Sequence, residues 1–304
     1  MSSNNARDII FYSIKDGIND GKDFFVVNAD FTGRPFIDIA KQWPERLIQV
    51  GIAEQNMISI ACGLALAGKK VFTFSPNPFL YLRAYDQIRN ALCAMDLSIT
   101  IVGNGMGFVN PGLGITHFPT EDYQLFSLCP NMNIFSVSDE TVAKEAANFV
   151  INESTGPNYI RIDYECDGIV PSQETVNIEK GFRIIKQGQG TLIITQGYLT
   201  RIVDNLSFSS KPTIIDLFKT PYDKEMLLSE MKKYEKVIVC EEQQLRGGIG
   251  SEILEFLNDN DIFLPILRRG VQYHKILPHT FGSREYWMKK FGVAVDDIKK
   301  TVEE

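Results

Sequence analysis

Several features that mark common protein classes are missing from this sequence of 304 residues. No apolar run reaches the roughly 18 residues that a membrane-spanning helix needs, and the first twenty residues lack the apolar core and cleavage site of a signal peptide. A basic excess is also missing, because the formal net charge is -7. This balance argues against a nucleic-acid surface. We therefore expect a cytoplasmic protein that binds neither membranes nor nucleic acids.

Closely spaced cysteine pairs of the CxxC type do not occur either. The five cysteines are odd in number and widely separated in the chain: Cys62, Cys93, Cys129, Cys166 and Cys240. Such cysteines are expected to be reduced and mostly buried in a cytoplasmic protein. Apolar residues make up 44% of the chain and charged residues 23%, which is the mix of a globular protein with a substantial core.

The first half of the chain alternates β-branched or aromatic runs with segments of helical period. Apolar residues at helical spacing predict helices over 52–67 and about 80–95, and Gly68 follows the first of these as a typical helix end. The predicted strands are 24–28, 47–50, 70–74, 98–103, 133–137 and 158–162. Alternation of this kind indicates a mostly parallel sheet with helices on both faces.

The second half repeats this pattern after a polar interruption. Residues 166–188 are rich in polar residues, contain Pro and Gly, and show no sustained helical period. The alternation then resumes, with strands expected at 191–195, 212–217, 236–242 and 263–267. We predict two consecutive α/β domains with mostly parallel sheets flanked by helices, at 1–165 and 189–304, joined by a linker at 166–188.

One heptapeptide, GIAEQNM at 51–57, lies where a predicted strand gives way to a helix. In parallel α/β sheets this edge is where ligand sites form. Complementing the helix dipole is enough to explain a glutamate in a first helical turn, so Glu54 alone does not indicate catalysis. The whole heptapeptide, however, resembles the glutamate motif of the pyrimidine-binding domain in transketolases and deoxyxylulose-phosphate synthases.

Further segments resemble the same family in the same order. The stretch 79–90, FLYLRAYDQIRN, is similar to the segment that packs on the aminopyrimidine ring, and 113–117, LGITH, is similar to the GxTH loop. Near the end of the chain, 282–292 resembles the closing helix of transketolase C-terminal domains. The resemblance spans nearly the whole chain and implies a pyrimidine-binding domain followed by a transketolase C-terminal domain.

The resemblance implies a thiamine diphosphate enzyme and assigns roles toward that cofactor. Glu54 is expected to be catalytic, because in the family this glutamate hydrogen-bonds the aminopyrimidine ring. That bond favours the tautomer whose nitrogen removes the thiazolium proton. Phe79 and Tyr85 are expected to form an apolar stacking face for the ring. Asp30, at the end of the first predicted strand, resembles an acidic residue near the cofactor, although a turn-forming role explains it equally well.

Two further residues are assigned to the substrate by the same resemblance. His117, in the GxTH loop, is expected to reach the substrate and to be catalytic together with Glu54. Arg161, at the end of a predicted strand, resembles an arginine that binds substrate phosphate, a task suited to the planar guanidinium. The implied reaction is transfer of a two-carbon ketol unit between sugars or sugar phosphates, which makes the protein a transferase of carbohydrate metabolism.

The GDG motif with which full-length transketolases hold the diphosphate through Mg²⁺ is absent from this sequence. The resemblance therefore implies a split enzyme, in which a separate N-terminal subunit carries Mg²⁺ and the diphosphate site. We expect an α2β2 heterotetramer, with this chain holding no metal and being inactive without its partner.

Three positions depart from the family pattern near the substrate. Leu113 stands where many relatives have an acidic residue, Tyr164 where many have a second arginine, and Phe118 where a polar residue is usual. Fewer hydroxyl and anion contacts suggest an acceptor other than the common pentose phosphate. A branched or nucleotide-linked sugar is the hypothesis that these changes allow.

Three other functions are compatible with parts of the sequence. The β subunit of a 2-oxoacid dehydrogenase decarboxylase has the same two domains and the same glutamate, but a different histidine motif. A regulatory subunit of the same fold would have no need for Glu54. A dinucleotide-binding protein is suggested by GNGMG at 103–107, but no helix follows that motif directly, so the evidence for it is weak.

Overall fold

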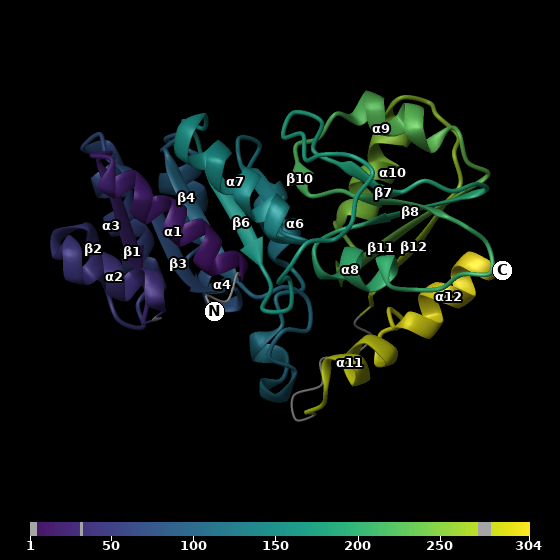
Figure 1. Ribbon diagram of the computed structural model, residues 1–304, viewed down its shortest axis with the longest axis horizontal. Helices are drawn as coiled ribbons and strands as arrows, with labels where there is room; N and C mark the ends of the chain where they lie inside the picture. Colours follow the sequence, from purple (N-terminus) through teal and green to yellow (C-terminus); the bar gives the residue numbers. More distant parts are fainter. Residues whose placement is uncertain (1–4, 31–32, 273–280) are drawn as a thin grey trace.

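The computed structural model describes residues 5–30, 33–272 and 281–304. Figure 1 shows two α/β domains side by side, with the first in purple to teal and the second in green to yellow. Both contain a mostly parallel sheet flanked by helices, which confirms the predicted fold class. Within the described residues, no helix is both long enough and apolar enough to cross a membrane.

The first domain is built on a seven-stranded sheet in the order β10-β5-β6-β4-β3-β1-β2, in which only β10 runs antiparallel to its neighbour. Its strands are β1 (Phe24–Asn28), β2 (Leu47–Gln49), β3 (Lys70–Pro76), β4 (Ile99–Asn104), β5 (Asn133–Ser136), β6 (Asn158–Ile162) and β10 (Lys219–Thr220). Its helices are α1 (Ala6–Asn19), α2 (Arg34–Gln42), α3 (Glu54–Leu66), α4 (Asn77–Arg83), α5 (Tyr85–Gln87), α6 (Asp122–Ser127) and α7 (Glu140–Asn152), with a π-helical segment η2 (Ile88–Cys93).

Alternate residues of these strands enter two separate cores, as the period of two along a strand requires. On one face, Val27 and Val71 pack under α3, α4 and η2. On the other face, Val26 and Phe72 pack under α1, α2 and α7. Because both faces are covered, the strands are apolar throughout and were recognisable in the sequence.

The second domain has a five-stranded sheet in the order β12-β11-β8-β9-β7, with β7 antiparallel at one edge. Its strands are β7 (Arg183–Lys186), β8 (Thr191–Thr195), β9 (Thr213–Asp216), β11 (Lys236–Gln244) and β12 (Ile266–Val271). Its helices are α8 (Tyr198–Asp204), α9 (Lys224–Met231), α10 (Ile249–Asp259), α11 (Arg284–Lys290) and α12 (Val295–Glu303). Helices α9 and α10 cover one face and α8 lies on the other (Figure 1).

Some elements differ from the sequence-based expectations. Strand β7 falls inside the segment predicted as a linker, and β12 begins three residues later than the strand predicted at 263–267. The single helix predicted over about 80–95 is divided into α4, α5 and η2. Helices α1, α2 and α6 and the short strand β10 have no counterpart among the predicted elements. The two strands that were missed, β7 and β10, are short and lie at sheet edges, where they are paired on one side only.

A buried arginine joins the two domains. Arg284 begins α11, and its guanidinium donates to both carboxylate oxygens of Asp163 and of Glu242, at 2.6–3.1 Å. Asp163 follows β6 of the first domain, whereas Glu242 lies on β11 of the second. The side chains of Asp163 and Glu242 are 0% and 4% exposed. Water therefore cannot solvate either carboxylate in place of the arginine.

Replacing Arg284 by alanine is expected to destabilise the protein by about 3–5 kcal/mol, because two buried carboxylates lose their counter-charge. Burial already raises the pKa of Glu242, and in the variant this carboxyl loses the arginine that opposes the rise, so it folds most readily when protonated. The loss should therefore be largest at neutral pH and smaller toward pH 5. Urea unfolding at several pH values measures it. The control, Lys300→Ala, removes an exposed ion pair with Glu304, and an equal loss there would contradict the prediction.

Candidate active site

Most of the residues predicted to serve the site follow the carboxyl ends of adjacent parallel strands. Asp30 comes after β1, Glu54 after β2, Phe79 after β3, and His117 in the loop after β4. These strands are neighbours in the order β4-β3-β1-β2. Since parallel strands end at a common edge, the topology gathers the four residues along one edge of the first sheet.

Glu54 is the first residue of α3, and it is only 4% exposed. The residue before it, Ala53, offers no side chain to cap the helix, so the carboxylate is the acidic group nearest the helix N-terminus. Both carboxylate oxygens accept hydrogen bonds from Nη1 of Arg83, at 3.2 Å each. The predicted catalytic carboxylate is therefore buried and has an arginine as its partner.

Arg83 connects three of the predicted residues. Its guanidinium lies 4.3 Å from the ring centroid of Phe79, one helical turn earlier on α4, where residues i and i+4 share a face. The Phe79 ring in turn meets the imidazole of His117 edge-on, with centroids 5.0 Å apart. The structure thus brings Glu54, Phe79 and His117 together. Arg83 was not singled out from the sequence, although it lies inside the segment that carried the resemblance.

The exposure of Arg83 separates this ion pair from the others that hold buried acids. Among the described residues, the acids in salt bridges with side chains at most 4% exposed are Glu54, Asp122, Asp139, Asp163, Asp216 and Glu242. The arginines opposite the other five are at most 8% exposed, whereas Arg83 is 48% exposed. The partner of Glu54 can therefore leave without becoming a buried, unpaired charge.

His117 is held by a tight loop. Gly114 adopts a φ of +76° immediately before the short helical turn Ile115–His117, a conformation that favours glycine. The hydroxyl of Thr116 lies 3.0 Å from Nδ1 of His117. Partial burial lowers the pKa of His117 below its usual value, so the imidazole is mostly neutral near pH 7 and can accept or donate a proton.

A buried polar network fixes the helix that carries Phe79 and Arg83. Asp122, which is 0% exposed, accepts hydrogen bonds from Asn77 at 2.8 Å and from the Tyr159 hydroxyl at 2.7 Å. Its other oxygen accepts from Arg161 at 3.3 Å. Asn77 begins α4, so the position of α4 depends on these bonds.

The neighbouring carboxylate links the same helix to the second domain. Glu121 accepts a hydrogen bond from the Tyr81 hydroxyl of α4 at 2.8 Å and another from Gln244 of β11 at 2.6 Å. Tyr81 of the first domain and Gln244 of the second thus donate to the same carboxylate, and this shared partner ties α4 to the end of β11.

Three predicted residues lie apart from this cluster. Tyr85 is directed toward α6, since its hydroxyl donates to the carbonyl of Leu125 at 2.9 Å. Asp30 is exposed, with a φ of +49°. Arg161 is 1% exposed and ion-paired with Asp122, so the structure holds its guanidinium inside the protein and not at a surface. A contact between Arg161 and a substrate phosphate requires that burial to change. The roles assigned to these three residues stay predictions.

The three departures from the family pattern occupy different environments. Leu113 is 55% exposed and Tyr164 is 42% exposed, with the Tyr164 hydroxyl bonded to Asn104. Phe118 is 3% exposed and packs edge-on against Trp287, with centroids 5.2 Å apart. Phe118 therefore contributes to the packing of α11 against the loop, whereas Leu113 and Tyr164 are open to solvent.

Two protein-family models together cover most of the chain. The pyrimidine-binding domain of transketolase matches residues 14–164, and the transketolase C-terminal domain matches residues 183–298. These matches agree with the two structural domains, and the chain belongs to the transketolase family.

Curated relatives include both a chain of similar length and much longer ones. An apulose-4-phosphate transketolase subunit of Actinobacillus succinogenes is 29% identical over 297 residues, covering 92% of each chain. The 1-deoxy-D-xylulose-5-phosphate synthase of Halothermothrix orenii is 31% identical over 280 residues, but only 42% of it is covered. The chain thus spans less than half the length of that synthase.

Among solved structures, a split-gene transketolase described as an inactive β4 tetramer matches with a TM-score of 0.81 and 25% identity. The match covers 98% of this chain and 96% of the other. The fold and the extent of the chain therefore agree with one part of a split transketolase.

The lowered pKa of His117 generates a testable prediction about its surroundings. Replacing Phe79 by alanine removes the ring that covers the imidazole, so the pKa of His117 should rise toward its usual value. Carbon-detected NMR titration of the histidines, with His117→Gln for assignment, measures it. Phe149→Ala, a change at a ring packed against Phe135, is the matched control. An unchanged pKa in the Phe79 variant would show that other groups cause the shift.

Proposed function

We propose that this chain is the catalytic pyrimidine-binding subunit of a thiamine diphosphate-dependent transketolase that transfers a two-carbon ketol unit between sugars. The observation that carries the proposal is the buried carboxylate of Glu54, placed at the carboxyl edge of the sheet beside an exposed, replaceable arginine and an aromatic ring. A structural glutamate in a first helical turn would need none of these neighbours.

The residues present fit the aminopyrimidine half of the cofactor. Glu54 offers a buried oxygen for a ring nitrogen, and Phe79, which is half-buried, offers an apolar face. When bound, thiamine diphosphate supplies a nucleophilic carbon and an electron sink for the two-carbon unit. Glu54 then holds or releases the proton that it shares with the ring nitrogen. When no cofactor is bound, Arg83 balances the charge of the carboxylate.

His117 and the exposed residues around it are proposed to serve the substrate. The imidazole meets the Phe79 ring edge-on, and its lowered pKa favours exchange of protons with a sugar hydroxyl near neutral pH. Asp30, Tyr85 and Arg161 keep the roles that the resemblance implies: the first two toward the cofactor and the third toward a phosphate.

A separate subunit is proposed to hold Mg²⁺ and the diphosphate. Within the described residues, no group of three or more His, Cys, Asp or Glu side chains is arranged to bind a metal ion. The name of the Actinobacillus relative describes it as a subunit, and the split-gene tetramer of β chains is described as inactive. These names support a partner subunit, and we propose an α2β2 enzyme in the cytoplasm in which this chain becomes active on assembly.

The assembly is tested by titrating thiamine diphosphate and Mg²⁺ into this chain, with and without a partner subunit that carries a GDG-type domain. We expect tight binding and ketol transfer only with the partner. Glu54→Gln in the assembled enzyme should keep the thermal unfolding midpoint and lower kcat by about 100-fold or more. Unchanged turnover in this variant would favour a regulatory subunit, and decarboxylation of a 2-oxoacid would favour the dehydrogenase-type alternative.

The acceptor is proposed to be a branched or nucleotide-linked sugar instead of ribose 5-phosphate, because Leu113 and Tyr164 add apolar surface where relatives have charges. The variant Tyr164→Arg should improve kcat/KM for ribose 5-phosphate by about tenfold, since an arginine adds a charge-assisted bond to phosphate. Tyr286→Arg, at another exposed tyrosine, is the control. High efficiency of the unmodified enzyme with ribose 5-phosphate would refute the proposal.

A further inference from the structure

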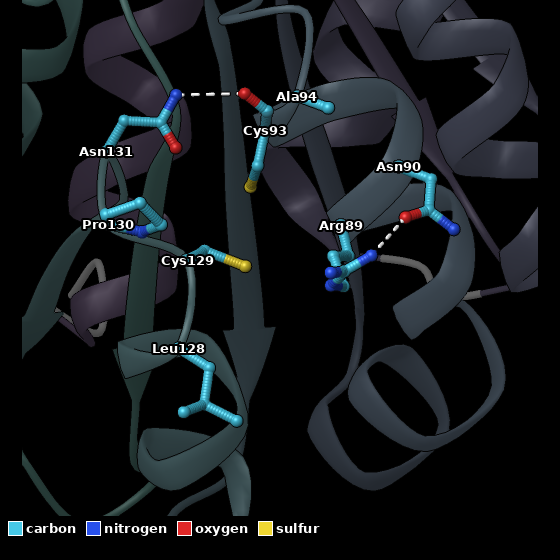
Figure 2. A pocket seen from close by; sticks show the side chains of 8 residues that line it. All are labelled: Arg89, Asn90, Cys93, Ala94, Leu128, Cys129, Pro130 and Asn131. Carbon is cyan, nitrogen blue, oxygen red and sulfur yellow. Dashed lines mark hydrogen bonds between the residues drawn. The ribbon is translucent and has the colours of Figure 1, made fainter.

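Two cysteines far apart in the sequence line one pocket on the outside of the first domain. Cys93 ends η2, and Cys129 lies in the loop between α6 and β5. Figure 2 shows both sulfur atoms pointing into the same gap beside Arg89 and Leu128. The pocket has a volume of about 450 Å³, which is enough for a small molecule.

The two segments that carry these cysteines are already fastened to each other. The side-chain amide of Asn131 donates to the backbone carbonyl of Cys93 at 2.9 Å and to the carboxylate of Asp96 at 2.8 Å. The side chains of both cysteines also line the same pocket. Their proximity is therefore a built feature of the fold and does not depend on a chance approach of two loops.

The surroundings make the two thiols chemically unequal. The neighbouring Cys93 thiol, together with the charge of Arg89, lowers the pKa of Cys129 to about 7. The same contact with Cys129 raises the pKa of Cys93. By contrast, burial raises the pKa of nearby Cys62 to about 11. Thiol–disulfide exchange requires one thiolate that attacks first and a neighbouring thiol that attacks the resulting mixed disulfide.

We propose that Cys93 and Cys129 form an oxidisable pair, a modification site at which a low-molecular-weight disulfide enters the pocket and converts the two thiols into a protein disulfide. The Cys129 thiolate attacks one sulfur of the small disulfide, the S–S bond breaks, and the first small thiol leaves with a proton. Cys93 then gives up its proton, its sulfur attacks that of Cys129, and the second small thiol leaves. Two protein thiols are oxidised and one disulfide is reduced to two thiols.

The second step becomes easier once the first has occurred. The main cause of the raised pKa of Cys93 is its contact with Cys129. When Cys129 carries the small thiol, its negative charge is gone, so Cys93 ionises more readily and acts as the attacking sulfur. The sequence of steps therefore follows from the position of the two groups.

The experiment treats the full-length folded chain with glutathione disulfide and follows thiol loss by mass spectrometry with peptide mapping. We expect a Cys93–Cys129 disulfide, with Cys129 reacting about tenfold or more faster than Cys62 at pH 7.5. Cys93→Ser should stop the reaction at a mixed disulfide on Cys129, and Cys129→Ser should leave Cys93 unreactive. Cys62→Ser is the matched control and should react as the unmodified chain does.

The rate of Cys129 modification should rise with pH through the pKa of that thiol, about 7, and level off once the thiol is fully ionised. Circular dichroism of each serine variant verifies that it is folded. Equal reaction at Cys62, Cys166 and Cys240, or a stable mixed disulfide on Cys129 while Cys93 is intact, would overturn the proposal.

Discussion

The buried carboxylate of Asp122 is the constraint on which the candidate site depends. It lies inside the first domain, where an ionised acid is costly unless its oxygens are fully satisfied. It obtains that satisfaction from Asn77, Tyr159 and Arg161, which come from α4 and β6. These hydrogen bonds to Asp122 fix the start of α4, and α4 in turn places Phe79 and Arg83 beside Glu54. The site is therefore held in place by an acid that does not belong to it.

The buried acids of this protein differ in how exposed their arginine partners are. Asp122, Asp163 and Asp216 face arginines that are as buried as they are, so separating any of these pairs leaves two uncompensated charges and the pairs act as permanent joints. Glu54 is equally buried, but its arginine is half in water. Water can solvate the guanidinium of Arg83 when it moves away. Of these four carboxylates, only that of Glu54 is therefore both held in place and available to a ligand.

Sequence reasoning located what depends on local pattern and missed what depends on distant partners. Most strands were predictable because both faces of the sheets are covered. Short motifs singled out Glu54, Phe79 and His117, which the structure brings together, and their roles stay predictions. The pairing of Arg83 with Glu54 joins two helices that follow different strands, and no spacing in the chain encodes it. Arg161 was assigned to a substrate phosphate by its resemblance to a family arginine, and its buried ion pair with Asp122 had no signal in the sequence.

The helical segment from α4 to η2 connects the candidate site with the cysteine pocket. Arg83 points to Glu54, whereas Tyr85, two residues later, points to α6 and contacts Cys129. Residues two apart on a helix face different directions, so one short segment contacts both places. The π-helical turn at Ile88–Cys93 then carries Cys93 to Cys129. The end of the segment that carries Arg83 to Glu54 therefore also forms one wall of the cysteine pocket.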